Sequence, residues 1–161
     1  MSHEALGKSD EYYTPEYIFR ALKCEFDMDA ASPVDRRFCC VPAKDFITKD
    51  SLVSLWQGFI WLNPPFEGRN DKKKWLDKMN KHRNGIVLTP DRSSTDWWQD
   101  AALECDLLMQ IRGKIKFVND KGEICKQPAN GTTLFGYGPK ARMALINAQK
   151  SKLGIILKQQ P

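Results

Sequence analysis

Four consecutive residues, Asn63-Pro64-Pro65-Phe66, combine hydrogen-bond acceptors with an aromatic ring directly after an apolar run. The two prolines stiffen the chain and remove two backbone N–H donors, so that carbonyl acceptors remain. The side chain of Asn63 adds an amide oxygen beside them. A rigid cluster of acceptors can hold the hydrogens of an amino group, and Phe66 offers a face on which a planar ring can stack.

The chemistry that requires such a cluster is methylation of the exocyclic amino group of a base. The lone pair of this nitrogen is delocalised into the ring, which makes the nitrogen a poor nucleophile. Acceptors from Asn63 and from the Pro64 carbonyl would draw it towards tetrahedral geometry and direct its lone pair at a methyl donor. A base in a duplex must first be flipped out, and Phe66 would stack on it. The alternative interpretation is a strand-ending turn with Phe66 in the core.

The run before this motif, Phe59–Leu62, has the length of a buried strand, and similar runs alternate with amphipathic segments along the chain. This alternation predicts an α/β architecture, in which ligands bind beyond the carboxyl ends of the strands. The other expected strands are Phe26–Ala30, Ile86–Thr89, Leu107–Ile111, Thr132–Tyr137 and Gly154–Lys158. The expected helices are one capped by Thr14 with Pro15 in its first turn, then Asp71–Lys81, Thr95–Glu104 and Lys140–Gln149.

Two connecting segments are expected to be less regular. The stretch between the first strand and about Asp50 shows no clear period, and a hairpin is expected to join Lys114–Val118 to Glu123–Cys125. We expect one domain spanning residues 1–161.

Composition limits the class of protein. No apolar run approaches the ~20 residues that a membrane span needs, and the N-terminus has no secretory signal. The five cysteines form no CxxC pair, and only His3 and His82 could supply imidazoles, so no metal site is expected. Reduced thiols indicate a cytoplasmic protein. The net charge of +5 permits a polyanionic partner without requiring one.

Several blocks, in this order, resemble the phage-type DNA N6-adenine methyltransferase (Dam) family: "DEYYTPEYIFRAL", "FDMDAAS", "WQGFIWLNPPF", "GIVLTPDRSSTDWW", "IRGKIKF" and "GTTLFGYG". The resemblance implies a Rossmann-like methyltransferase fold, with helices on both faces of a mostly parallel sheet and Thr132–Tyr137 as an antiparallel strand. It implies methyl transfer from S-adenosylmethionine to adenine N6 in double-stranded DNA, in a bacterial host cell. Asn63, Pro64, Pro65 and Phe66 are then the catalytic residues.

The resemblance also assigns residues to the cofactor. The "YYTP" block places Tyr13, Thr14 and Pro15 against it, and the loop after the first strand carries Ala30 and Ala31 where related enzymes have glycines. Carboxylates of Asp29 and Asp27 are expected to bind its ammonium group. Asp45 is expected at its ribose and Phe46 at its adenine, with Asn63 shared between cofactor and substrate.

Basic residues near these blocks are candidates for DNA contact. Phosphate contacts are expected from Arg69, Lys72, Lys73, Lys74, Arg92, Arg112 and Lys114. For the lysines the alternative is a solvated helix face.

Two alternative functions stay open at this point. One is methyl transfer to another amino acceptor, such as cytosine N4, an RNA base or a protein glutamine. The other is a non-catalytic DNA-binding relative that has lost the cofactor.

Overall fold

The computed structural model describes residues 12–65, 71–126 and 128–159. Seven strands form one sheet in the order β2-β1-β3-β4-β6-β5-β7. Their bounds are β1 Phe26–Asp29, β2 Ala43–Phe46, β3 Ile60–Leu62, β4 Gly85–Pro90, β5 Leu107–Ile111, β6 Thr132–Tyr137 and β7 Gly154–Gln159. The helices of the described ranges are α2 Glu16–Leu22, α3 Asp71–His82, α4 Asp96–Glu104, α5 Pro139–Lys150 and the short 3₁₀ helix η1 Ser51–Val53.

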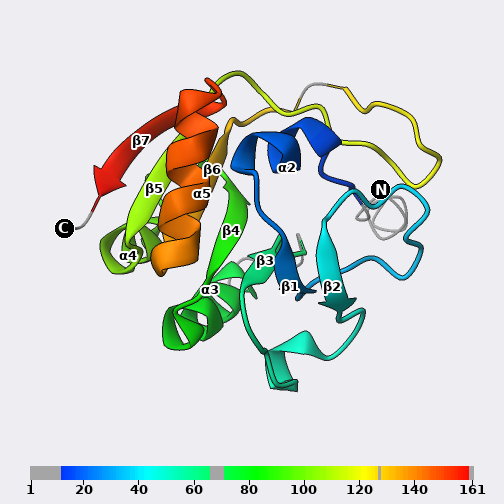
Figure 1. Cartoon of the computed structure of the whole chain (residues 1–161), viewed down its shortest axis with the longest axis horizontal. Coiled ribbons are helices and arrows are strands. Elements are labelled where there is room, and N and C mark those ends of the chain that lie inside the picture. The colour runs from blue at the N-terminus through cyan, green and yellow to red at the C-terminus, as the bar shows by residue number, and fades with distance from the viewer. Residues whose placement is uncertain (1–11, 66–70, 127, 160–161) are drawn as a thin grey trace.

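The sheet has a parallel half and an antiparallel half. Strands β2, β1, β3 and β4 pair in parallel. Strand β6 pairs antiparallel with both β4 and β5, and β7 pairs antiparallel with β5. The expected antiparallel strand at Thr132–Tyr137 is therefore confirmed, and β7 is a second one. Figure 1 shows β2 and β7 at the two edges of the sheet.

Helices cover both faces of the sheet, as expected. On one face, apolar residues of α2 and α5 pack with Trp61, Ile86 and Leu134 in one core cluster. On the other face, Trp75, Leu76 and Met79 of α3 and Ala101 of α4 join a second cluster. In Figure 1, α5 lies in front of the sheet.

Two local expectations are wrong, and a third is met only in part. Helix α2 has Pro15 at its N-cap, and Thr14 is buried and does not cap it. Strand β2 lies within the stretch expected to be irregular. It was not predicted because it is a short edge strand whose mostly exposed residues show no apolar alternation. The hairpin is reduced to an isolated bridge between Val118 and Ile124, and Val118 also bridges Tyr13.

The topology decides which loops meet. Because β1, β2, β3 and β4 are parallel, their carboxyl ends all lie at the same end of the sheet. The residues that follow these strands are Ala30, Ile47, Asn63 and Asp91. Strand β5 runs in the same direction, since both β4 and β5 are antiparallel to β6, and it is followed by Arg112.

Candidate functional site at the carboxyl ends of the strands

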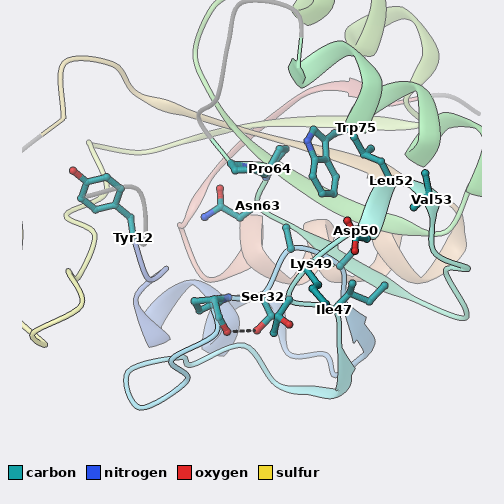
Figure 2. Close-up of a pocket in the computed structure, with 16 residues that line it drawn as sticks. Tyr12, Ser32, Ile47, Lys49, Asp50, Leu52, Val53, Asn63, Pro64 and Trp75 are labelled. Carbon is teal, nitrogen blue, oxygen red and sulfur yellow. Dashed lines mark hydrogen bonds between the residues drawn. The ribbon is translucent and has the colours of Figure 1, made fainter. Parts of the chain in front are cut away.

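A cavity of about 690 Å³ lies beyond the carboxyl ends of the parallel strands. The loops after β1, β2 and β3 form most of its wall, and Tyr12 and Trp75 complete it (Figure 2). Its lining residues are Tyr12, Ala30, Ala31, Ser32, Pro33, residues 47–53, Asn63, Pro64, Pro65 and Trp75. Backbone hydrogen bonds join two of the loops, because Ile47 N–H donates to the Asp29 carbonyl and Ser32 N–H donates to the Ile47 carbonyl, each at 2.9 Å.

The structure brings three residues of the Asn-Pro-Pro-Phe motif to this cavity. Strand β3 is completely buried, and the polar residue Asn63 follows directly at its carboxyl end. Asn63, Pro64 and Pro65 then line the cavity, and Figure 2 shows Asn63 and Pro64 between Tyr12 and Trp75. Phe66 lies outside the described residues.

The loop after β1 is made of small residues. Ala30 N–H donates to the Trp61 carbonyl at 3.0 Å, which ties this loop to the end of β3. Ala30, Ala31 and Ser32 form the cavity wall where bulkier side chains would fill it. The two alanines expected at a cofactor therefore lie next to Asn63, across two neighbouring strands.

The acid that reaches the cavity from the β2 side is Asp50. The expected residues Asp45 and Phe46 belong to β2, are exposed, and do not line the cavity. The Asp45 carboxylate accepts a hydrogen bond from Phe46 N–H at 2.8 Å, and the Arg36 guanidinium lies 3.9 Å from the centre of the Phe46 ring. No local pattern in the sequence distinguishes Asp45 from Asp50. In the structure, Asp45 lies in β2, whose last pair with β1 is Phe46 with Asp29, and the segment that lines the cavity begins after it.

Trp75 is a second lining residue that sequence reasoning missed. It lies on α3, and its ring packs nearly parallel to Trp56 with 6.4 Å between ring centres. Its position in an apolar helix pattern is indistinguishable from that of a core residue, because it also belongs to the core cluster under α3.

A smaller hollow of about 30 Å³ adjoins the cavity and contains Asp29. Four lining residues are shared by both: Tyr12, Ala31, Pro33 and Asn63. The Asp29 carboxylate accepts a hydrogen bond from Ala31 N–H at 3.3 Å and lies 3.8 Å from the Arg36 guanidinium. Burial raises the pKa of Asp29 to about 6, because desolvation disfavours its charged form.

The residues of the "YYTP" block do not all line the same hollow. Tyr13 and Thr14 line the smaller hollow, and the Tyr13 hydroxyl donates to the Asp35 carbonyl at 2.6 Å. Pro15 lines neither hollow and stands at the N-cap of α2. Tyr12 reaches the larger cavity.

Asp27 lies away from both hollows. Its carboxylate accepts a hydrogen bond from Phe59 N–H at 2.7 Å, which lowers the pKa of Asp27 and ties the start of β1 to the turn before β3. The structure thus connects Asp27 to the sheet and brings only Asp29 of this pair to the site.

The basic candidates fall into two groups. Lys72 is only 8% exposed, and the ammonium group of Lys73 is paired with Asp77 at 2.7 Å. Lys74, Arg92, Arg112 and Lys114 are exposed, and Arg69 lies outside the described residues. The side chains of the second group are therefore open to solvent, whereas that of Lys72 is not.

Two further observations concern the described ranges only. They contain no group of three or more His, Cys, Asp or Glu side chains arranged to hold a metal ion. None of the helices described there is long and apolar enough to cross a membrane.

Comparison with known proteins identifies the family through one family model. No curated protein and no solved structure matches the chain. The model that matches describes DNA N-6-adenine-methyltransferases (Dam) and covers residues 1–155 of the 161. The chain therefore belongs to the Dam family, a family of DNA methyltransferases.

Proposed function

We propose that this protein transfers a methyl group from S-adenosylmethionine to the N6 amino group of adenine in double-stranded DNA, using a Rossmann-like methyltransferase fold. One observation carries the proposal: Asn63 and Pro64, after β3, line the same cavity as Ala30 and Ala31, after β1. Methyl transfer to an amino group requires such a juxtaposition, because acceptor and donor must lie within bonding reach of each other.

The residues of the cavity fit the cofactor. A volume of about 690 Å³ is in the range of small-molecule sites. Ile47 and Leu52 offer apolar surface for an adenine ring, and the Asp50 carboxylate offers acceptors for ribose hydroxyls. Asp29, in the adjoining hollow, offers a carboxylate for the ammonium group. When bound, S-adenosylmethionine supplies an electrophilic methyl group on a sulfonium centre.

The chain's own contribution is to hold the amino group. The Asn63 amide oxygen and the Pro64 carbonyl accept hydrogen bonds from the two N–H groups of this amine. These hydrogen bonds localise the lone pair on the nitrogen. The nitrogen bonds the methyl group as the bond between that methyl and the sulfonium sulfur breaks. It then releases one proton to water, so no strong base is needed beforehand. Phe66 provides the stacking face for a flipped adenine, and Lys74, Arg92, Arg112 and Lys114 contact phosphates of the surrounding strand.

The test is transfer of labelled methyl from S-adenosylmethionine to duplex DNA, followed by hydrolysis and identification of the methylated base. We expect N6-methyladenine, and about a hundredfold slower transfer by Asn63→Ala. Asn147→Ala, on helix α5 and outside both hollows, is the matched control and keeps the wild-type rate.

Two outcomes would overturn the proposal. Methylated cytosine, RNA or glutamine as the product would assign the acceptor cluster to another amino group. A folded protein that transfers no methyl group to any nucleic acid and does not bind the cofactor would be a non-catalytic relative.

A further inference from the structure

Lys78 points its ammonium group into the turn that forms one wall of the cavity. It lies on α3, and it donates to the carbonyls of Ser51 at 2.8 Å, Leu52 at 3.1 Å and Ser54. An ammonium group has three N–H donors, so these three carbonyls occupy all of them. Lys78 therefore has no donor left for a DNA phosphate, although it belongs to a helix rich in lysine.

The three carbonyls belong to η1 and to the residue that ends it. The Ser51 carbonyl also accepts the hydrogen bond from Ser54 N–H at 3.2 Å that closes η1, whereas the carbonyls of Leu52 and Ser54 lie at the end of this helix. Carbonyls at the end of a helix carry partial negative charge, which a cation stabilises. Ser51 and Leu52 are themselves lining residues of the cavity. The ammonium group of Lys78 thus binds backbone carbonyls of residues that line the cavity, without lining the cavity itself.

A second contact holds the same turn. The Trp56 indole Nε1–H donates to the Ser51 hydroxyl at 2.9 Å and to the Ser51 carbonyl at 3.1 Å. The Lys78 ammonium also lies 4.8 Å from the centre of the Trp56 ring, within the range of a cation–π interaction. Trp56 in turn packs on Trp75, which lines the cavity from α3.

These contacts hold η1, which contains Leu52 and directly follows Asp50. Asp50, directly before η1, has a left-handed backbone conformation with φ 56°. A non-glycine residue adopts this conformation at a cost, so its neighbours must hold it in place. Among the described contacts, the Lys78 ammonium is the cation that binds this turn.

We propose that Lys78 is a positioning residue for the methyl donor: through η1 it sets the position of Asp50 and Leu52 in the cavity wall. The inference rests on the proposed function, since it takes the cavity to be the cofactor site. Lys78 itself touches neither cofactor nor DNA in this arrangement.

The test compares Lys78→Met with Lys81→Met, an exposed lysine on the same helix. The probe is S-adenosylhomocysteine, the demethylated cofactor, titrated calorimetrically into each protein. We expect Lys78→Met to bind it about tenfold or more weakly and Lys81→Met to bind it like the wild type. In turnover, Lys78→Met raises KM for S-adenosylmethionine and keeps kcat at saturating cofactor, which a general loss of folded protein would not do.

Trp56→Phe keeps an aromatic ring and removes the second donor to the turn, so it tests the same wall if Lys78→Met does not fold. We expect it to weaken binding of the same probe. Unchanged affinity in the folded Lys78→Met protein, or in Trp56→Phe when only that variant folds, would overturn the inference. Absence of binding by the wild type would instead overturn the proposed function, so the two failures are distinguishable.

Discussion

Thr89 and Thr133 are cross-strand partners in the antiparallel pair of β4 and β6, and both side chains are 0% exposed, yet their hydroxyl groups differ. The Thr133 hydroxyl donates to the Asp91 carboxylate and accepts from Trp98 Nε1 at 3.1 Å and Gln110 Nε2 at 3.2 Å. The Thr89 hydroxyl has no hydrogen-bond partner among the described residues. The Thr133 hydroxyl therefore stabilises the fold through three hydrogen bonds, whereas burial of the Thr89 hydroxyl without a partner destabilises it.

The first prediction uses this pair. Thr133→Val should lower the free energy of unfolding by about 2–4 kcal/mol, because it leaves partly buried groups of Asp91, Trp98 and Gln110 without their shared partner. Thr89→Val is the matched control; it removes an unsatisfied hydroxyl and should be neutral or slightly stabilising. Chemical denaturation of both variants measures the difference. Equal effects in the two variants would contradict it.

The second prediction concerns the pH dependence of stability. The folded protein keeps a proton on Asp29 up to about pH 6, whereas an unfolded Asp loses it near pH ~4. The folded state binds more protons in this window, so the free energy of unfolding should fall as pH rises from about 4 to 6, by an amount of the order of 3 kcal/mol. Denaturation at a series of pH values measures this slope.

Asp29→Asn should remove that slope, and Asp100→Asn, an exposed acid on α4, should keep it. The same Asp29 variant should bind S-adenosylhomocysteine more weakly at pH 7.5, since the proposed partner of the ammonium group loses its charge. A slope that persists in Asp29→Asn would assign the titration to another group.

The third prediction fills the cavity. Ala31 lines both hollows, so Ala31→Leu should displace a bound cofactor and lower the affinity for S-adenosylhomocysteine about tenfold or more. Ala129→Leu, at an exposed position outside both hollows, should bind normally. Calorimetric titration of both proteins checks the result. Normal binding by folded Ala31→Leu would place the cofactor elsewhere.

The fourth prediction concerns DNA. Arg92 is exposed on a turn that is held firmly, because its carbonyl accepts from Thr95 N–H at 2.8 Å and from the Thr95 hydroxyl at 2.7 Å. If its guanidinium contacts a phosphate, Arg92→Gln should reduce by about 1 the slope of log affinity against log salt concentration. Lys150→Gln makes the same change of charge on α5 and should leave this slope unchanged. Fluorescence anisotropy with labelled duplex DNA at several salt concentrations measures both.

Features that depend on neighbouring residues could be predicted from the order of the amino acids. Apolar runs and helical periods predicted six of the seven strands, all except β2, and three of the helices to within one or two residues at each end. The change from the buried Phe59–Leu62 run to Asn63-Pro64-Pro65 marked the end of a strand, and these residues do line a cavity. Such features follow from local periodicity and turn chemistry, which a linear reading contains.

Which polar residues face the cavity depends on contacts between distant parts of the chain. Asp45 and Asp50 are both acids in one polar stretch, but pairing with β1 ends β2 at Phe46 and leaves only Asp50 on the lining segment. Lys74 and Lys78 are lysines one helical turn apart; the first is exposed and the second is bound by carbonyls of η1. The physical reason is that a cavity wall forms where the ends of parallel strands meet, and those ends are far apart in the chain.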